Sequence, residues 1–362
     1  MTASRIAGVG LLPLHLPLRQ PFVTALGEKW ESRNLLVAVR LSDGTTGYGE
    51  ASASLAWPEE TQGAMVKALR PLIPALMGQP IVSFRRSLHR IREQAGEQPA
   101  AASALECALI DAYTRAAGLP LWRWLGGRQR SLTTGITISA WEPEVAARFA
   151  RRVIRAGFRR LKVKVTGRDI DQDLRRLVAV HRVAPRAALW ADGNQGFSAL
   201  EAIRFCQFLR QQRLPIRLFE QPVPRSDLEG LRRVEMEGLI PVAADESART
   251  LEETLRLLRR RWVSVINVKL AKCGLTGAIQ IIRQARAAQR TLMIGCMAES
   301  AIGLSHSVAL ACGSGAFNFV DLDSHLLVVS PRCRPGFSAR GARLGVYPTR
   351  PGTGVEFPFP GP

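Results

Sequence analysis

The chain has 362 residues, more than one ordinary domain needs, and this length fits an α/β barrel with a small additional domain. Hydrophobic residues make up 46% and charged residues 22%, which excludes a disordered chain, and its 31 glycines and 22 prolines are too few for a fibrous one. The formal net charge is +20, and only six of the 50 basic residues are lysine, so the excess is one of arginine.

The distribution of the arginines argues against a nucleic-acid partner. A charge of +20 raises that class because phosphate backbones bind basic surfaces. The arginines, however, occur in scattered pairs such as Arg151-Arg152, and the only run of three is Arg259–Arg261. Zinc-finger spacing, an aromatic-rich RNA motif and a basic tail are all missing from the sequence. We therefore interpret the charge as a solvated basic surface, with polyanion binding as the alternative.

The six cysteines and the apolar stretches bear on location. No two cysteines form a C-x-x-C pair or a tight framework, so we expect reduced thiols and a cytoplasmic protein. The apolar stretch from Val9 to Leu18 is broken by prolines and lacks a signal-peptide cleavage pattern. The longest uncharged stretch, Ser300–Val320, contains glycines, serines and a histidine, so we expect no membrane span.

Residues 1–130 have the pattern of a small α+β unit. Two hydrophobic runs separated by Ser42-Asp43-Gly44 predict a β-hairpin, and two later segments have helical periodicity. The Pro/Gly-rich residues from about 326 to 362 are expected to pack back on this unit and complete it. The predicted strands are Leu35–Leu41 and Thr45–Ala51, and the predicted helices cover 59–76 and 99–117.

From Ser131 onward, short β-rich runs alternate with amphipathic helical segments. Each of the first seven runs is followed by a helical stretch, and an eighth run closes the series. This alternation predicts a modified TIM barrel, (β/α)7β, over residues 131–325, with residues 1–130 as an α+β capping domain. The predicted strands are Thr133–Ser139, Arg159–Val165, Ala187–Ala191, Ile216–Glu220, Ile240–Ala244, Val263–Leu270, Thr291–Cys296 and Phe317–Leu322.

Ionisable residues end most of these strands. From Lys164 the next four, Asp192, Glu220, Asp245 and Lys269, follow at steps of 28, 28, 25 and 24 residues, which is one β/α unit each time. The carboxyl ends of barrel strands converge on one face, where the active sites of such barrels lie. We therefore expect these five side chains to meet in one cleft.

The three acids of this set predict a metal site. Mg²⁺ prefers oxygen ligands in octahedral geometry and keeps open positions for water or substrate. Asp192, Glu220 and Asp245 would supply such ligands from three neighbouring strands. The alternative is that each acid pairs with one of the many arginines at the barrel rim, but the matched placement in three successive units favours Mg²⁺.

The lysines predict acid/base chemistry. Four of the six fall in two strand-end motifs, Lys162-Val-Lys164 and Lys269-x-x-Lys272, in a chain that otherwise uses arginine. Arginine stays protonated near neutral pH, whereas burial or a neighbouring cation lowers the pKa of a lysine enough to free its base form. We therefore predict that Lys164 and Lys269 are catalytic, and we expect Lys272 outside the barrel mouth. Lysine as surface filler is the alternative.

Two aspartates end the last predicted strand. Asp321 and Asp323 are two residues apart, so their side chains share one face of the strand. A pair of carboxylates suits a cationic group such as a substrate ammonium, and a solvated strand end is the alternative. His306 and His325 have no metal-ligand spacing and are interpreted as structural.

Together these motifs resemble those of the enolase superfamily, muconate-lactonizing subgroup, over nearly the whole chain. The pair Asp321-x-Asp323, preceded by Gly295-Cys-Met-x-Glu299-Ser300, is similar to the dipeptide epimerases of that subgroup, of the L-Ala-D/L-Glu type. The other motifs that carry the resemblance are Lys162-x-Lys164, Asp192-x-Asn194, Glu220-Gln221-Pro222, Asp245-Glu246-Ser247, Ile266-Asn-Val-Lys269-x-x-Lys272-Cys-Gly274 and Gly47-Tyr-Gly-Glu50.

The resemblance implies a site and a dipeptide substrate, in a protein expected to be a homo-oligomer. It implies that the two catalytic lysines lie on opposite faces of the substrate, and that the last two aspartates hold the α-ammonium of the dipeptide. The implied roles are Mg²⁺ binding by Asp192, Glu220 and Asp245, proton transfer by Lys164 and Lys269, ammonium binding by Asp321 and Asp323, support of the carboxylate or tuning of the neighbouring lysine by Lys162, and lining of the substrate site by Thr137, Cys296 and Met297.

The implied reaction is Mg²⁺-dependent epimerisation at the α-carbon of the C-terminal residue. One lysine removes the proton to give an enediolate, and the other returns a proton on the opposite face. The family's muconate cycloisomerases and o-succinylbenzoate synthases share the metal and the lysines but need no ammonium pocket, so they are the alternative that the aspartate pair discriminates. A barrel that has lost catalysis and binds anions through its arginines is a third possibility.

One departure bears on the substrate. The segment Pro21–Gly27 corresponds to a loop that, in the Ala-Glu type of epimerase, carries an arginine for the glutamate side chain of the substrate. Here that position is Gly27, followed by Glu28 and Lys29. The departure argues against Ala-Glu specificity and leaves a hydrophobic or different dipeptide as an equally supported substrate.

Overall fold

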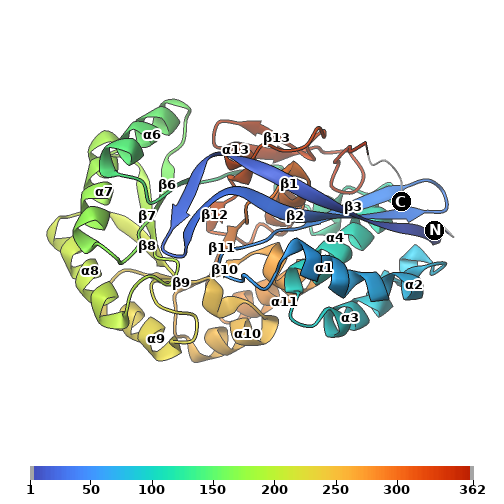
Figure 1. Ribbon diagram of the computed structural model, residues 1–362, viewed down its shortest axis with the longest axis horizontal. Coiled ribbons are helices and arrows are strands. Elements are labelled where there is room, and N and C mark those ends of the chain that lie inside the picture. The colour runs from blue at the N-terminus through green and yellow to red at the C-terminus, as the bar shows by residue number, and fades with distance from the viewer. Residues whose placement is uncertain (1–3, 359–362) are drawn as a thin grey trace.

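The computed structural model describes residues 4–358 as a barrel with helices on its outside, joined to an antiparallel sheet (Figure 1). The barrel is an eight-stranded parallel sheet whose strands follow one another in chain order. Its two edges meet where the Gly135 N–H donates to the Val320 carbonyl at 2.7 Å. The strands are β5 (Ile136–Ile138), β6 (Arg160–Lys164), β7 (Ala188–Asp192), β8 (Ile216–Glu220), β9 (Val242–Ala244), β10 (Val265–Val268), β11 (Thr291–Gly295) and β12 (Phe319–Asp321).

A helix follows each of the first seven barrel strands, so the predicted (β/α)7β fold is confirmed. Two of these helices begin with a capping box, in which Ser198 or Thr250 and the glutamate three residues later satisfy the first free backbone N–H groups. The helices are α6 (Pro143–Arg155), α7 (Ile170–Val183), α8 (Ala199–Gln211), α9 (Leu228–Glu237), α10 (Leu251–Arg260), α11 (Leu270–Ala287) and α12 (Ala301–Ser314), with a 3-10 turn at Glu246–Ala248 and a short α13 (Ser324–Leu327) after β12.

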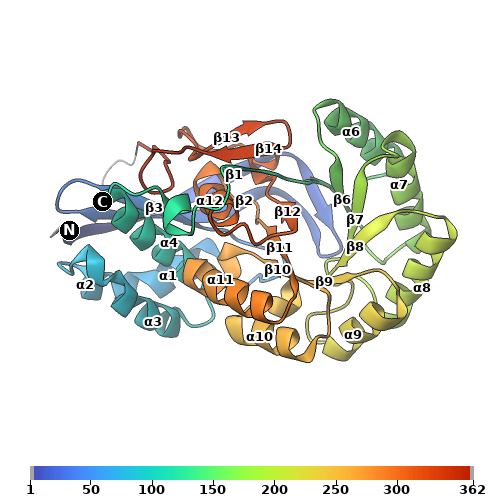
Figure 2. The same ribbon diagram turned by 180° about the vertical axis from the view of Figure 1, so that it is seen from behind.

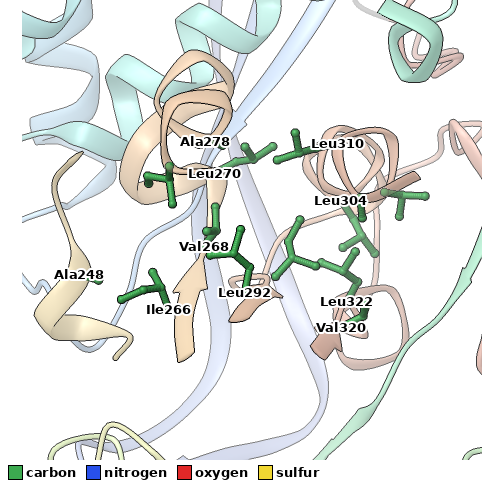
Figure 3. Close-up of a cluster of buried hydrophobic side chains, with 14 of the residues drawn as sticks. Ala248, Ile266, Val268, Leu270, Ala278, Leu292, Leu304, Leu310, Val320 and Leu322 are labelled. Atoms are coloured by element: carbon green, nitrogen blue, oxygen red, sulfur yellow. The ribbon is translucent and has the colours of Figure 1, made fainter. Parts of the chain in front are cut away.

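Alternation along the strands sorts their side chains between two cores. Ile266 and Val268 of β10 point outward and pack with residues of α11 and α12 such as Ala278 and Leu304 (Figure 3). Val265, one residue earlier, belongs instead to the small core inside the barrel. Because successive side chains alternate, Asn267 and the Lys269 position share the inward face with Val265. The hydrophobic pattern therefore aims the polar strand ends into the barrel.

The first predicted barrel strand divides into two elements. Residues 136–138 form β5 of the barrel, but Thr133 belongs to β4 (Ser131–Thr133), which pairs outside the barrel. It pairs with β14 (Arg343–Val346), and β14 pairs in turn with β13 (Phe337–Arg340). The three strands form an antiparallel sheet beside α12 (Figure 2). Gly135 lies between β4 and β5, and an added Cβ there would lie 3.0 Å from the Trp190 ring.

The N-terminal sheet contains one strand more than predicted. The hairpin prediction is confirmed by β2 (Gly27–Leu41) and β3 (Thr46–Ala51), and β1 (Ile6–Thr24) adds to β2 in the order β1-β2-β3. Prolines 13 and 17 interrupt the apolar pattern of β1, but β1 is an edge strand, where a missing N–H is tolerated. The segment 21–27, predicted as a loop, is the tip of the β1–β2 hairpin, which reaches across to the barrel mouth (Figure 1).

Short helices pack against this sheet. The predicted helix 59–76 is interrupted, because Pro71 and Pro74 each lie in the first turn of a new helical segment, whereas the predicted helix 99–117 is continuous. The helix at 84–95 was not predicted. The elements are α1 (Gln62–Leu69), a 3-10 turn at Arg70–Leu72, α2 (Ile73–Leu76), a 3-10 turn at Ile81–Ser83, α3 (Phe84–Ala95), α4 (Pro99–Ala116) and α5 (Leu121–Trp124).

The C-terminal segment also packs on the N-terminal sheet. The Tyr48 hydroxyl donates to the Phe357 carbonyl at 3.0 Å, and Leu18 of β1 bridges to Val328. Val328 and Val355 share a small core with side chains of β1 and β2. These contacts agree with the expected return of residues 326–362, while the domain boundaries at about residues 130 and 326 remain a prediction.

Helix α4 crosses β3 at two glycines. A Cβ at Gly49 would lie 2.0 Å from the Ala104 carbonyl oxygen, and one at Gly47 would lie 2.2 Å from the Ala112 nitrogen. Both obstacles are backbone atoms, which cannot rotate away. The close approach explains why the strand before Glu50 reads Gly-Tyr-Gly.

We expect Gly49→Ala to destabilise the protein by about 3 kcal/mol or more, because overpacking against backbone forces the helix off the sheet. Gly63→Ala is the control, since an added Cβ there meets nothing within 4 Å and the change should stay within about 1 kcal/mol. Urea unfolding of both variants measures the difference. Equal free energies of unfolding for the two variants would contradict the packing described.

Candidate active site

The predicted catalytic and metal-binding residues lie side by side at the carboxyl ends of the barrel strands. Lys164 pairs in register with Asp192 of the next strand, and Asp192 pairs with Glu220 of the one after. Asp245 and Lys269 directly follow β9 and β10. The chain spacing of 24–28 residues therefore does bring these five positions to one end of the barrel.

Lys162 lies at the centre of the acidic side chains. Its ammonium forms an ion pair with Asp321, and it lies 3.3 Å from Asp192 Oδ2 and 3.4 Å from Glu220 Oε2. Burial acts to lower the pKa of Lys162, but the charges of Asp321, Glu220 and Asp192 outweigh it and hold this pKa well above its ordinary value. Lys162 is therefore a fixed positive charge.

Each of the two predicted catalytic lysines is paired with a carboxylate. Lys164 Nζ lies 2.6 Å from Asp192 Oδ2 and 2.7 Å from Asn194 Oδ1. Lys269 Nζ lies 2.5 Å from Asp245 Oδ2. Burial acts to lower the pKa of Lys269, but Asp245 outweighs it and raises this pKa above the ordinary range. In this arrangement Lys269 is an ammonium, the form that delivers a proton.

Lys272 has a role that the sequence did not reveal. It does not line the cavity described below, yet its ammonium donates to Asp245 Oδ1 at 2.7 Å and to the carbonyls of Asp245 and Asn267. Its side chain is 2% exposed. Lys272 lies in the first turn of α11 and contacts Asp245 from outside the cavity. Lys272 thus orients the carboxylate that Lys269 also contacts.

The three predicted metal ligands are buried and crowded. None is more than 1% exposed, and burial together with the charges of Asp192 and Asp245 raises the pKa of Glu220 to about 8. Asn267 donates to Glu220 Oε1 at 2.7 Å. Across residues 4–358 no three His, Cys, Asp or Glu side chains are grouped so as to hold a metal ion. Lysines and Asn267 contact the oxygens of these three carboxylates. The donors are nevertheless all carboxylates, the type that Mg²⁺ prefers, and their mutual repulsion favours an added cation.

Asp321 and Asp323, at the end of β12, both contact Thr137 of β5. Asp323 Oδ2 accepts the Thr137 N–H at 2.6 Å, the Thr137 hydroxyl lies 3.4 Å from Asp321 Oδ1, and Cys296 Sγ lies 3.8 Å from Asp323 Oδ1. Burial and the charge of Asp321 raise the pKa of Asp323 to about 6. The structure thus brings together four predicted substrate-site residues, and it adds the Lys162–Asp321 ion pair, which was not predicted.

These groups face one cavity between the barrel mouth and the β1–β2 hairpin. Phe22, Leu26 and Lys29 line it from the hairpin, and Trp57 lines it from the segment after β3. Asp192 and Glu220 lie beneath its surface. The predicted residues that line it are Thr137, Lys162, Lys164, Asp245, Lys269, Cys296, Met297, Asp321 and Asp323.

Sequence reasoning assigned no role to several polar residues of the site. Asn194 accepts a hydrogen bond from Lys164 and donates one to Glu246 at 3.1 Å. Its backbone φ is 38°, in the left-handed region. Asn267 is a polar residue inside an apolar strand, and that position was an available signal. Lys29 offered no comparable signal, because only the register of β1 with β2 places it over the barrel.

The histidines and the helices complete the description. His306 and His325 lie outside the cavity lining, and burial lowers the pKa of His325 to about 4, as suits a neutral buried side chain. None of the helices within residues 4–358 is both long and apolar enough to cross a membrane.

Fold and site define a capped barrel enzyme with a buried lysine- and carboxylate-lined cavity. Residues 7–126 match the family model of the mandelate racemase/muconate lactonizing enzyme N-terminal domain, and residues 144–359 match that of the enolase C-terminal domain-like family. The chain therefore belongs to the mandelate racemase/muconate lactonizing enzyme family of the enolase superfamily, and it is an isomerase of the racemase and epimerase class.

Three relatives show how far the similarity extends. An aromatic dipeptide epimerase of Herpetosiphon aurantiacus is 39% identical over 94% of this chain and 95% of its own length. An L-Ala-D/L-Glu epimerase of Thermotoga maritima is 34% identical over 95% of this chain and 99% of its own length. The crystal structure of the dipeptide epimerase from Enterococcus faecalis V583, complexed with Mg and L-Leu-L-Tyr, superposes with a TM-score of 0.90 at 30% identity, covering 98% of this chain and 100% of that one.

Proposed function

We propose that this protein epimerises a dipeptide at the α-carbon of its C-terminal residue by two-lysine 1,1-proton transfer. The supporting observation is that Lys164 and Lys269 line one cavity from opposite sides of the barrel. Their strands, β6 and β10, are four apart in an eight-stranded barrel, so the two ammonium groups approach a substrate from opposite faces. Inversion of a carbon centre needs that geometry.

Each lysine has a defined part in the transfer. The lysine on the side of the α-hydrogen acts as a neutral base and takes the proton, which leaves the electron pair in an enediolate. The ammonium on the other side returns a proton, so the configuration inverts. In the reverse direction the two lysines exchange roles. Lys162, held as a permanent cation, keeps positive charge close to the carboxylate on which the negative charge develops.

Mg²⁺ is the proposed cofactor. Asp192, Glu220 and Asp245 are the residues that would hold it, and the relative from E. faecalis was crystallised with Mg. When bound, the ion would act as a Lewis acid that stabilises charge on the substrate carboxylate. The bound ion would also compete with Lys164 and Lys269 for the carboxylates of Asp192 and Asp245. A lysine that loses its carboxylate partner more readily adopts the neutral form that a base requires.

We propose that Asp321 and Asp323 bind the α-ammonium of the dipeptide. A charged group that leaves water needs an oppositely charged partner. Within residues 4–358, Lys162 is the one cation that pairs with these two carboxylates. Burial and the neighbouring charge of Asp321 raise the pKa of Asp323, and a bound ammonium would offset both. An ammonium pocket supports a dipeptide over the substrates of cycloisomerases and succinylbenzoate synthases, which lack the amine.

We expect Asp323→Asn to lower kcat/KM for a free dipeptide about 10- to 150-fold, because a charge-assisted hydrogen bond contributes about 1.5–3 kcal/mol. Asp323 is the cleaner test of the pair, since Asp321 also neutralises Lys162. The exposed Asp171→Asn is the matched control and should be unaffected. Equal turnover of N-acetylated and free dipeptides would sink the ammonium pocket and favour the lyase alternative.

We also propose a cytoplasmic location, because all six cysteines are free thiols. Homo-oligomeric assembly and the lack of nucleic-acid and membrane partners remain predictions. The molar mass from light scattering tests homo-oligomeric assembly. A filter-binding assay at 0.15 M salt tests whether the protein binds nucleic acid.

A further inference from the structure

The turn that carries Lys269 and Lys272 is set apart from the rest of α11. Gly274 interrupts the helix with φ 65° and ψ 178°, a backbone conformation that residues other than glycine rarely adopt. Residues 269–273, which we call the lysine turn, lie before this break, and the helix resumes after it and runs to Ala287. The long part of α11 alone therefore does not fix the position of Lys269.

Helix α4 holds α11 on both sides of this break. The two helices lie beside each other, with α4 outside the barrel (Figure 2). The Ser103 hydroxyl donates to the Leu270 carbonyl at 2.6 Å, and Glu106 Oε1 accepts the Thr276 N–H at 2.6 Å. Ser103 and Glu106 are three residues apart and therefore share one face of α4. One bond lies before Gly274 and the other lies after it.

Glu106 caps the second part of α11. The first backbone N–H groups of a helix have no partner within the helix, and the helix dipole favours a carboxylate at that end. Glu106 is buried, and its other oxygen, Oε2, accepts from Arg92 at 2.8 Å. Arg92 also donates to the Thr276 hydroxyl. The carboxylate is thus held by two partners, and α4 sets the point at which α11 resumes.

The space around the break gives these hydrogen bonds their importance. An added Cβ at Gly274 would lie 2.7 Å from Glu106 Oε2, so only glycine admits the carboxylate this closely. A separate cavity beside the lysine turn is lined by Ser103, Glu106, Lys272 and Cys273, among others. Because apolar packing does not fill this side, the bonds from α4 contribute more to fixing the turn than they would in a closely packed core.

The other side of the lysine turn faces the reacting centre. Lys272 Nζ donates to the Asn267 carbonyl and to Asp245 Oδ1, each at 2.7 Å, and Lys269 Nζ reaches the other oxygen of Asp245. A displacement of the turn would move Lys269 directly. Lys164 lies on β6, four strands away in the barrel, and would stay in place. The contacts from α4 therefore bear on one catalytic lysine and not on the other.

We propose that Glu106 is a positioning residue that holds Lys269 within proton-transfer distance of the substrate. It acts through the backbone of α11, since Glu106 lies outside the lining of the active-site cavity. This inference rests on the proposed epimerisation by two lysines. Proton transfer needs the two atoms within hydrogen-bond reach, so a displacement of about 1 Å is expected to cost up to about 100-fold in rate.

The test measures α-proton exchange in D₂O for each stereoisomer separately, with the full-length Mg²⁺-loaded protein and the dipeptide that the wild type labels fastest. Lys269→Ala identifies the isomer that Lys269 serves. For that isomer, Glu106→Ala should lower the exchange rate about 10- to 100-fold, mostly through kcat. For the isomer that Lys164 serves, the rate should fall less than about threefold. Glu106→Gln keeps an oxygen for the Thr276 N–H and should restore most of the lost rate.

Asp111→Ala is the matched control. Asp111 is another buried carboxylate of α4 that pairs with an arginine, Arg115, and accepts backbone N–H groups, those of Tyr48 and Thr353. None of these partners lies on α11. The control should be destabilised as Glu106→Ala is, but it should keep the wild-type ratio of the two exchange rates.

Ser103→Ala is a milder variant that removes one hydrogen bond and no charge. It should lower the exchange rate of the isomer served by Lys269 about two- to tenfold, which corresponds to the net contribution of one hydrogen bond. This result does not depend on whether Glu106→Ala folds. Equal losses for both isomers in the Glu106 and Ser103 variants, or an unchanged ratio in both, would overturn the positioning role while epimerisation stood.

Backbone hydrogen–deuterium exchange separates the positioning role from the reaction. Glu106→Ala should speed amide exchange in the peptide that covers residues 270–280 at least about tenfold, whereas Asp111→Ala should not. If that change appeared but the wild type epimerised no dipeptide, the proposed function would fail while the hold of Glu106 on the lysine turn stood. Amide exchange as slow as in the wild type would refute that hold.

Discussion

Replacing Lys164 or Lys269 with alanine is expected to abolish epimerisation and leave the fold intact. General acid–base catalysis contributes about 10²–10⁴-fold, and each lysine acts in both directions of the reaction, so kcat should fall by at least that factor. Arginine at either position should fail almost as completely, because a guanidinium does not become a base near neutral pH. Steady-state kinetics by polarimetry, with circular dichroism to confirm folding, measures the effect.

The two variants should differ in the hydrogen exchange that they retain. Each lysine is the base for one stereoisomer, so the remaining lysine should still exchange the α-proton of the isomer that it faces. Lys164→Ala and Lys269→Ala are therefore expected to show opposite isomer preferences in D₂O. Lys67→Ala, remote from the barrel, is the control. Turnover close to the wild-type rate in either variant would remove that lysine from the mechanism.

The second large effect is expected on removal of the metal or of a ligand. Chelation with EDTA should abolish activity, and added Mg²⁺ should restore it, because several kcal/mol of charge stabilisation are lost with the ion. Asp245→Asn should cost about 10³-fold or more in kcat and weaken the Mg²⁺ dependence, since Asp245 is also the partner of Lys269 and Lys272.

Metal content distinguishes the causes of that loss. Asp192→Asn, Glu220→Gln and Asp245→Asn should each reduce the Mg²⁺ bound at equilibrium, whereas Asp171→Asn should not. A metal-free protein with full activity would show that the three carboxylates serve the lysine network alone.

The barrel and its polar strand ends could be predicted because both depend on local patterns in the sequence. Each strand is a short apolar run followed by a helix, and the spacing of the charged residues matches one β/α unit. β1 was missed because Pro13 and Pro17 break its alternation, and only its place at the edge of the sheet makes them harmless.

The rest of the site depends on contacts between distant segments. The Lys162–Asp321 ion pair joins β6 to β12, which are separated by β5 alone only after the barrel closes. Lys272 reaches Asp245 through the first turn of α11, and Lys29 faces the cavity through the register of a hairpin. None of these contacts follows from periodicity, so sequence reasoning placed the predicted catalytic groups at one end of the barrel but not the partners that set their charge.

Deuterium incorporation tests the central claim most directly. The wild-type protein with Mg²⁺ would be incubated in D₂O with a library of L,L-dipeptides and analysed by mass spectrometry and NMR. The account predicts one deuterium at the α-carbon of the C-terminal residue, in both stereoisomers, for a subset of the library, and no label without Mg²⁺. Failure to label any dipeptide, or deuterium at the N-terminal residue instead, would contradict it.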